Sequence, residues 1–144
     1  MKKIFFLLIS SFSFAQNTSE KEIIKPIENL FNAMKFVDSL GVKNAFSNSA
    51  IMQTFGKNQE IRTDKVEYFA KQVGASQAGD LDERFTISKI LVDGNMASVW
   101  VPYQFYYKGN FSHCGVNSFQ LAKINNDWKI QYIIDTRRKD NCIK

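Results

Sequence analysis

The second half of the chain holds four long runs of β-branched and aromatic residues between Arg84 and Asp135. Three turn-forming segments separate the runs: Asp93-Gly94, Lys108-Gly109-Asn110 and Asn125-Asn126. Asp-Gly and Asn-Asn are typical of the tight turns that join antiparallel strands. The pattern predicts a long antiparallel meander. A sheet of this length must bury at least one face against other elements.

The first half of the chain supplies helices to cover that sheet. A helical spacing of apolar residues follows position 22, carried by Ile23, Ile24, Ile27, Leu30, Phe31, Met34 and Val37. Ser19 to Glu22 has the form of a capping box, which predicts the start of the helix. Pro26 either kinks this helix or marks the place where its regular part begins.

Shorter elements lie between the first helix and the meander. We expect a second helix over Asp38 to Phe46 and a strand pair formed by Ile51 to Phe55 and Glu60 to Arg62. A third helix opens near Asp64 and ends at Gly74, with Val66, Phe69, Ala70 and Val73 on one face. Helices followed by an antiparallel meander indicate the α+β class.

The first fifteen residues have the features of a secretory signal peptide. Lys2 and Lys3 precede an apolar run from Ile4 to Phe14, and the small residue Ala15 closes it. The run is shorter than the roughly 20 residues of a membrane-spanning helix, and the residue directly after Ala15 is Gln16 rather than a cysteine that could carry a lipid anchor. We therefore expect residues 1–15 to be removed and 16–144 to form a single exported domain, periplasmic or secreted, without a membrane anchor.

The charge and metal-ligand content exclude several functions. The chain has 19 basic and 14 acidic residues, and 17 basic residues remain once Lys2 and Lys3 are removed. Their scatter argues against nucleic-acid binding, which needs a clustered basic face. One histidine and two distant cysteines match no zinc spacing, and we expect neither a metal nor a cofactor. With 13 Phe, 5 Tyr and 2 Trp, the chain can build a core and line a cavity.

The two cysteines, Cys114 and Cys142, both follow the expected cleavage point. An oxidising compartment permits a disulfide between them, which would tie the C-terminal tail to the sheet. Two free thiols are the alternative, and the sequence does not decide the geometry. We expect the bond.

The position of the turn in the last hairpin predicts which residues of its two strands lie opposite each other. A two-residue turn at Asn125-Asn126 places His113 opposite Arg138 and Asn117 opposite Ile134, so these side chains share the face that meets the helices. Asp135 then points to the other face, where Arg137 or a surface lysine can pair with it. A His113–Asp135 dyad is excluded in this register, although a one-residue bulge would restore it.

The preceding hairpin predicts an apolar outer face. A turn at Lys108-Gly109 places Gln104 beside His113 and Trp100 beside Asn117 on the inner face. The outward residues are then Val99, Val101, Tyr103, Phe105 and Tyr107. A sheet that is apolar on both sides needs two covers, which predicts a homodimer through this outer face. Alternatively, the tyrosine hydroxyls make the face acceptable to water.

Several segments resemble a known superfamily. They are Val99-Trp100-Val101-Pro102-Tyr103, Phe111 to Phe119 (FSHCGVNSF), Trp128-Lys129-Ile130 and Asp135-Thr136-Arg137-Arg138. With the order of elements, they resemble small exported bacterial members of the nuclear transport factor 2-like superfamily, the SnoaL-like and lumazine-binding proteins. The resemblance covers nearly all of residues 16–144. It implies a cone-shaped α+β barrel, a curved sheet wrapped on N-terminal helices around a pocket, and frequent dimerisation through the outer sheet.

The residues and the resemblance leave two main functions open. One is a small-molecule-binding protein with a ligand of unknown identity, whose pocket residues would be Phe31, Trp100, Gln104, His113, Asn117, Tyr132 and Arg138. The other is an isomerase or dehydratase, because enzymes of the superfamily use Asp, His or Tyr inside the cone. His113 would be its general acid or base, with Asp38 as the nearest candidate acid. We favour binding, because the predicted register leaves His113 without an acid partner; a purely structural module remains a third reading.

Overall fold

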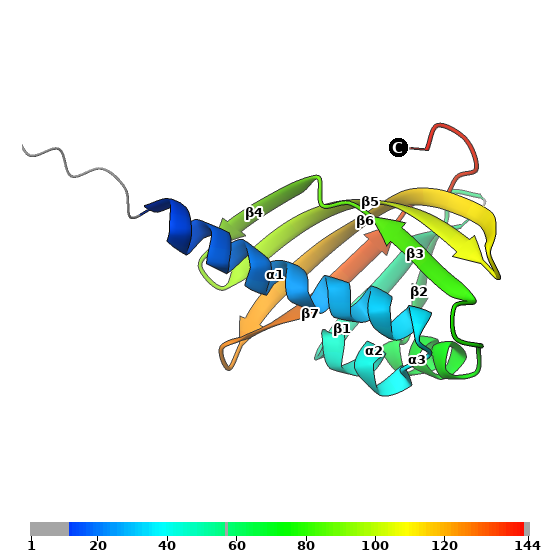
Figure 1. Ribbon diagram of the computed structural model, residues 1–144, viewed down its shortest axis with the longest axis horizontal. Helices are drawn as coiled ribbons and strands as arrows, with labels where there is room; N and C mark the ends of the chain where they lie inside the picture. The colour runs from blue at the N-terminus through cyan, green and yellow to red at the C-terminus, as the bar shows by residue number, and fades with distance from the viewer. Residues whose placement is uncertain (1–11, 57, 143–144) are drawn as a thin grey trace, which may run out of the picture.

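The computed structural model describes residues 12–56 and 58–142 (Figure 1). Its helices are α1 (Phe12–Lys35), α2 (Ser39–Ala45) and α3 (Val66–Gly74). Its strands are β1 (Phe46–Phe55), β2 (Ile61–Asp64), β3 (Leu81–Phe85), β4 (Lys89–Asp93), β5 (Met96–Tyr107), β6 (Asn110–Ile124) and β7 (Asp127–Asp135). The predicted α+β class is confirmed. The β5–β6 and β6–β7 turns lie at the predicted Lys108-Gly109 and Asn125-Asn126, and the β4–β5 turn lies one residue later than predicted, at Gly94-Asn95.

Helix α1 lies across the concave face of the sheet (Figure 1). Its apolar residues recur at helical spacing, and five residues of the predicted apolar face are buried: Ile23, Ile27, Leu30, Phe31 and Met34. The predicted start at a Ser19 capping box is wrong, because the helix begins at Phe12 and Ser19 lies in its interior. Pro26 also lies inside the helix. Most of the expected signal peptide, residues 1–11, lies outside the described residues.

The sheet is mixed rather than fully antiparallel. The strand order is β2-β1-β7-β6-β5-β3, with β4 pairing the other half of β5. Strand β1 runs parallel to β7, whereas the other described pairs are antiparallel. Since β2 and β3 lie at opposite ends of this order, the curved sheet stays open instead of closing into a barrel. The sequence did not predict the parallel pairing of β1 with β7.

Two β-bulges change which side chains face the helices. The β6–β7 register follows the prediction from the turn to Leu121 and Ile130, and then shifts by one residue at Gln131, so that Asn117 pairs with Asp135. The β5–β6 register shifts by one residue at Ser112, which pairs Phe105 with His113 and Val101 with Asn117. Both predicted registers are therefore wrong beyond the bulges, because a shift of one residue turns side chains to the opposite face.

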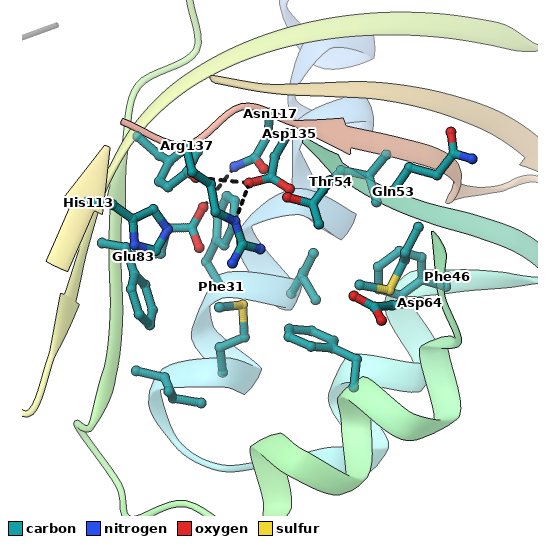
Figure 2. A pocket seen from close by; sticks show the side chains of 18 residues that line it. Phe31, Phe46, Gln53, Thr54, Asp64, Glu83, His113, Asn117, Asp135 and Arg137 are labelled. Atoms are coloured by element: carbon teal, nitrogen blue, oxygen red, sulfur yellow. Dashed lines mark hydrogen bonds and ion pairs between the residues drawn. The ribbon is translucent and has the colours of Figure 1, made fainter. Parts of the chain in front are cut away.

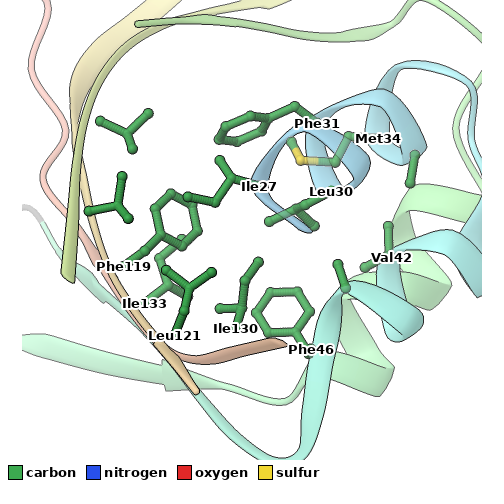
Figure 3. Packing of buried hydrophobic residues seen from close by; sticks show 14 of the residues in the cluster. Ile27, Leu30, Phe31, Met34, Val42, Phe46, Phe119, Leu121, Ile130 and Ile133 are labelled. Atoms are coloured by element: carbon green, nitrogen blue, oxygen red, sulfur yellow. The ribbon is translucent and has the colours of Figure 1, made fainter. Parts of the chain in front are cut away.

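The core lies between α1 and the concave face of the sheet (Figure 3). Phe31 packs its ring edge-on to Phe119, with 6.1 Å between ring centroids, and Ile27 and Leu121 are fully buried beside them. Leu30, Ile130 and Ile133 belong to the same cluster. Each buried side chain of this size stabilises the fold by about 1.5–3 kcal/mol. None of the described helices is both long and apolar enough to cross a bilayer.

Candidate functional site

A cavity of about 190 Å³ opens between the helices and the concave face of the sheet. Figure 2 shows His113, Glu83, Asn117, Asp135, Arg137 and Thr54 gathered on the sheet side, with Asp64 apart from them beside Phe46. The apolar lining consists of Leu30, Phe31, Met34, Phe46, Met52, Phe69, Leu81, Phe105 and Ile133. The polar lining consists of Gln53, Thr54, Asp64, Glu83, Tyr103, His113, Asn117, Asp135 and Arg137.

The two bulges align the polar groups in rows across the sheet. Thr54 pairs with Asp135, and Asp135 pairs with Asn117, so β1, β7 and β6 each contribute one polar residue to a single row. In a second row, Phe105 pairs with both Glu83 and His113. The two rows are joined where Asn117 Nδ2 donates a hydrogen bond of 2.7 Å to Glu83 Oε1. Four strands thus converge on one polar wall.

Asp135 is the most heavily hydrogen-bonded acid of this wall. Its Oδ2 accepts from Arg137 Nε at 2.8 Å and from the Tyr103 hydroxyl at 3.0 Å. The Asp135 side chain is only 10% exposed, whereas the Arg137 side chain is 49% exposed. Burial alone would lower the pKa of Arg137, but the hydrogen bond and charge of Asp135 outweigh it, and the pKa rises. Arg137 is therefore a permanent cation held at the cavity.

Glu83 has a different electrostatic state from Asp135. Burial of its carboxyl is the largest effect and raises its pKa to about 7. The hydrogen bond from Asn117 and the charge of Arg137 oppose this rise, and the negative charge of Asp135 adds to it. Glu83 thus exchanges a proton near neutral pH, and it can donate or accept a hydrogen bond according to its protonation.

His113 lies beside Glu83 on the same wall (Figure 2). Its Nδ1 is 3.0 Å from Ser112 Oγ, and its ring packs against those of Tyr103 and Phe105. Burial first, and then the charges of Arg137 and Lys139, lower the pKa of His113, while Asp135 acts in the opposite direction. The imidazole is accordingly neutral at pH 7.

Thr54 and Arg137 leave hydrogen-bonding capacity at the cavity. Thr54 is 3% exposed, and its Oγ1 has no hydrogen-bond partner among the described residues. Figure 2 shows Thr54 next to Asp135 and the Arg137 guanidinium reaching toward the middle of the cavity. Arg137 uses Nε for Asp135, and its two terminal nitrogens carry four further N–H donors. Ligand oxygens can accept bonds from these donors.

Of the seven pocket residues predicted from sequence, three line the cavity: Phe31, His113 and Asn117. The other four do not line it. Trp100 is 50% exposed and pairs with Ser118 on the convex face, while Gln104 pairs with Cys114 on the same side. Both assignments were wrong because the bulge at Ser112 turns these side chains outward.

The bulge at Gln131 has the same effect on the last strand. Tyr132 turns away from the cavity, and its hydroxyl donates to Gln53 Oε1 at 2.7 Å. Arg138 donates from Nε to the Asn141 carbonyl at 3.2 Å. Arg137 occupies the place in the cavity wall that was predicted for Arg138. The predicted pairing of Asp135 with Arg137 is present, but it lies on the inner face.

Asp38, the predicted candidate acid, caps a helix instead. Its Oδ1 accepts a hydrogen bond of 2.8 Å from the Gly41 N–H at the start of α2. This is the ordinary role of an aspartate at an N-cap. Asp38 does not line the cavity, so it has no part in the candidate site.

Sequence reasoning missed Thr54, Glu83 and Tyr103. A signal for Glu83 was present: it alternates with Leu81 and Phe85, two apolar residues at the spacing of one strand face. An acid between two inward residues points inward. No comparable signal marks Thr54 or Tyr103, because their facing depends on the β1–β7 pairing and on the bulge in β6.

The structure joins Cys114 and Cys142 in a disulfide, with 5.7 Å between their Cα atoms. Cys114 is fully buried. The described residues contain no group of three or more His, Cys, Asp or Glu side chains placed to hold a metal ion. The site therefore consists of carboxylates, one guanidinium, one imidazole and neutral polar groups.

The sequence matches a known family over most of its length. The profile of the family described as "Putative lumazine-binding" matches residues 18–132. The chain belongs to this family. A comparison of this member of the lumazine-binding family with the curated proteins found no match.

Solved structures share the fold of this family member at low sequence identity. A nuclear transport factor 2-like protein of unknown function from Shewanella baltica OS155 has a TM-score of 0.73 at 14% identity, covering 92% of this chain and 100% of its own. Another from Silicibacter pomeroyi DSS-3 has a TM-score of 0.71 at 15% identity, covering 85% and 98%. A Nostoc punctiforme PCC 73102 domain of unknown function with a cystatin-like fold has 0.69 at 16%, covering 86% and 80%. The predicted nuclear transport factor 2-like fold is confirmed.

Proposed function

We propose that this chain binds a small molecule in the cavity, with an anionic or carbonyl oxygen of the ligand held by Arg137. The observation that carries the proposal is the Asp135–Arg137 pair at the polar wall. Asp135 holds the guanidinium through Nε, and this orients the terminal N–H groups before any ligand arrives. Preorganised donors of this kind bind tightly because little conformational freedom is lost on binding.

The remaining lining supports a flat, partly polar ligand. The apolar side chains on the helix side, Phe31 and Phe69 among them, suit a ring system. Thr54, Asn117 and Glu83 offer hydrogen-bonding groups on the sheet side. The family description supports lumazine, a fused heteroaromatic ring with two carbonyl groups, as the first ligand to test.

The test compares two neighbouring arginines. We expect lumazine to bind the wild-type protein in calorimetry, and Arg137→Gln to weaken binding about 10- to 100-fold, since a hydrogen bond to a charged group contributes roughly 1.5–3 kcal/mol. Arg138→Gln is the matched control, because Arg138 does not line the cavity, and it should leave the affinity unchanged.

Equal losses in the two variants would contradict the role of Arg137. If lumazine does not bind the wild type, this ligand is excluded. Mass spectrometry of protein purified from its native host would then show whether the cavity carries another small molecule, and an empty cavity there would contradict the binding function.

An enzyme of the isomerase or dehydratase type is the second candidate, and the two carboxyl groups favour it. Asp135 is paired with a cation, while Glu83 exchanges a proton near pH 7. Such a difference in state is what acid–base catalysis requires. Glu83 would move the proton, with neutral His113 beside it. Glu83→Gln should then abolish turnover while leaving ligand affinity within about threefold; turnover that survives this change would exclude the mechanism.

We propose that the protein acts outside the cytoplasm. The signal-peptide pattern of residues 1–15 supports export, and the Cys114–Cys142 disulfide is consistent with an oxidising compartment. N-terminal sequencing of material from the cell envelope or the medium should begin at Gln16. Recovery of an intact Met1 terminus there would contradict cleavage.

We also propose a homodimer through the convex face of the sheet. The residues first expected there, Val99, Val101 and Tyr103, are buried on the concave side. The convex face instead exposes Leu91 and Trp100, on the neighbouring strands β4 and β5. Figure 1 shows the helices on the opposite side, so nothing within the described chain covers these two side chains.

A further inference from the structure

The residues after β7 continue along β6 and carry Arg137 into the cavity wall. Thr136 donates from its backbone nitrogen to the Val116 carbonyl at 3.1 Å, and its hydroxyl accepts from the Val116 N–H at 3.2 Å. Arg138 and Cys114 exchange two backbone hydrogen bonds of 2.8 Å. Arg137 lies between these two attachment points, and its side chain points to the inner face. We call residues 136–142 the tail.

Gly115 makes this path possible. A Cβ atom at position 115 would overlap the Thr136 carbonyl oxygen, so any other residue would push the tail away from β6. The same carbonyl oxygen lies 3.0 Å from the Tyr103 hydroxyl and shares its single proton with Asp135 Oδ2. Gly115 therefore permits the close approach that fixes the backbone immediately before Arg137.

The disulfide closes the far end of the tail. Lys139, Asp140 and Asn141 are exposed, and Cys142 returns to bond with Cys114 in the interior of β6. Cys114 is also the residue whose backbone pairs with Arg138. One residue of β6 thus holds the tail twice, once through its backbone and once through its side chain.

We propose that the Cys114–Cys142 disulfide and Gly115 together position Arg137, so that the oxidised tail completes the anion-binding end of the cavity. Cys142 is then a positioning residue that acts through the tail. Its significance for affinity rests on the proposed binding function, but the placement of Arg137 can be tested without any ligand.

The change of state is an ordinary thiol–disulfide exchange. A dithiol reductant attacks the disulfide, gives up two electrons and two protons, and becomes a disulfide itself, leaving two thiols at Cys114 and Cys142. The reduced tail keeps only its hydrogen bonds. Arg137 then leaves the cavity wall in a fraction of the molecules, because those few bonds must oppose the entropy of the exposed segment.

His113 reports the position of Arg137, since it is the only histidine in the chain. Its imidazole signals can be followed by NMR during a pH titration of the oxidised wild type and of Cys142→Ser. The pKa of His113 is lowered by burial and by the positive charges of Arg137 and Lys139, against the effect of Asp135. Release of the tail removes both cations and some burial, so we expect the pKa to shift upward in Cys142→Ser and in the reduced wild type.

Two variants separate positioning from general damage. Arg137→Gln should raise the pKa of His113 while the disulfide is intact. On reduction, the pKa of His113 should then rise less in this variant than in the wild type, because only the effects of Lys139 and of burial are left to be lost. Gly115→Ala should shift the pKa upward without any change at the cysteines. An unchanged pKa on reduction, or loss of the folded amide spectrum in Cys142→Ser, would overturn the proposal.

A ligand measurement keeps the proposal distinct from the proposed function. If lumazine binds the wild type, its dissociation constant should rise about tenfold on reduction, and reduction should have no effect in Arg137→Gln. If lumazine fails to bind while the pKa of His113 still shifts, the binding proposal fails and the positioning of Arg137 stands. If lumazine binds equally in both redox states of the wild type, the positioning proposal is wrong.

Discussion

Glu83 and Asp135 share one polar wall in opposite electrostatic situations. Asp135 has a guanidinium and a tyrosine hydroxyl as partners, whereas Glu83 has the neutral carboxamide of Asn117. The negative charge of Asp135 also disfavours ionisation of Glu83. A carboxyl without a nearby cation of its own is expected to hold its proton when buried. A single negative charge on this wall is therefore more stable than two.

Glu83→Gln should change the pH dependence of stability. The pKa of Glu83 is raised from 4.5 to about 7, so its protonated form contributes stability that is complete below about pH 4.5 and is lost as the pH rises toward 7. The glutamine variant lacks this loss. Its free energy of unfolding should gain on the wild type as the pH rises, by at most about 3 kcal/mol at pH 8. Urea unfolding of both proteins from pH 4 to 8 measures the difference; a pH-independent difference would contradict the raised pKa.

Single residues differ in how well the sequence predicted their roles. Phe31 and Asn117 belong to simple periodic patterns, and their facing follows from period alone. Arg137 and Arg138 are identical neighbours, and one residue of register decides which of them reaches the cavity. No property of the two side chains distinguishes them.

At the scale of elements, the sequence predicted the hairpin turns, which depend on local residues, but not the β-bulges. The Asn125-Asn126 turn is where the sequence placed it, and the turn expected at Asp93-Gly94 lies one residue later, at Gly94-Asn95. Gly94, Asn125 and Asn126 adopt positive φ angles, which Gly and Asn tolerate. The bulge at Gln131 coincides with a tertiary contact. Its side chain accepts from Ser47 Oγ at 2.7 Å and donates to the Ser49 carbonyl at 3.1 Å, at an irregular part of β1. The sequence of the β6–β7 hairpin alone does not indicate this contact with β1.

Two valine substitutions test the observed register of β5. Val101 is fully buried on the concave face, whereas Val92 on β4 is 48% exposed. Val101→Ala should lower the free energy of unfolding by about 2 kcal/mol, through lost burial and the cavity that remains. Val92→Ala removes the same atoms and should cost less than about 0.5 kcal/mol. Chemical denaturation measures both, and equal costs would contradict the inward facing of Val101.

At the scale of the whole molecule, the helices cover the concave face and leave the convex face to solvent or to a partner. Trp100→Lys should disrupt the proposed dimer, because a lysine cannot be buried without a partner charge. Light scattering at micromolar concentration should give twice the chain mass for the wild type and a single chain mass for the variant. Tyr68→Lys is a control, since Tyr68 is an exposed aromatic residue of helix α3 and not of the sheet. A wild-type monomer would contradict the proposal.

The sequence predicted the fold class, but it did not predict how all the strands pair. Helical and strand periodicities indicated α+β, and the family resemblance indicated a curved sheet around a pocket. The parallel pairing of β1 with β7 was not predictable. Paired residues of these two strands, such as Gln53 and Ile134, are about 80 residues apart in the sequence. Pairings over such distances carry no local sequence signature.

The strand order has a consequence for how the chain acquires its structure. β7 is the last of the described strands, yet it lies in the interior of the sheet and joins β1 to β6. Until it is added, β1 with β2 and the β3–β6 segment are two fragments with no strand between them. The chain must therefore be nearly complete before the sheet can assemble, and its closure is a late, non-local step that slows folding. A chain that stops before Asp127 would expose the edges of both fragments and aggregate, even though it retains helices α1, α2 and α3.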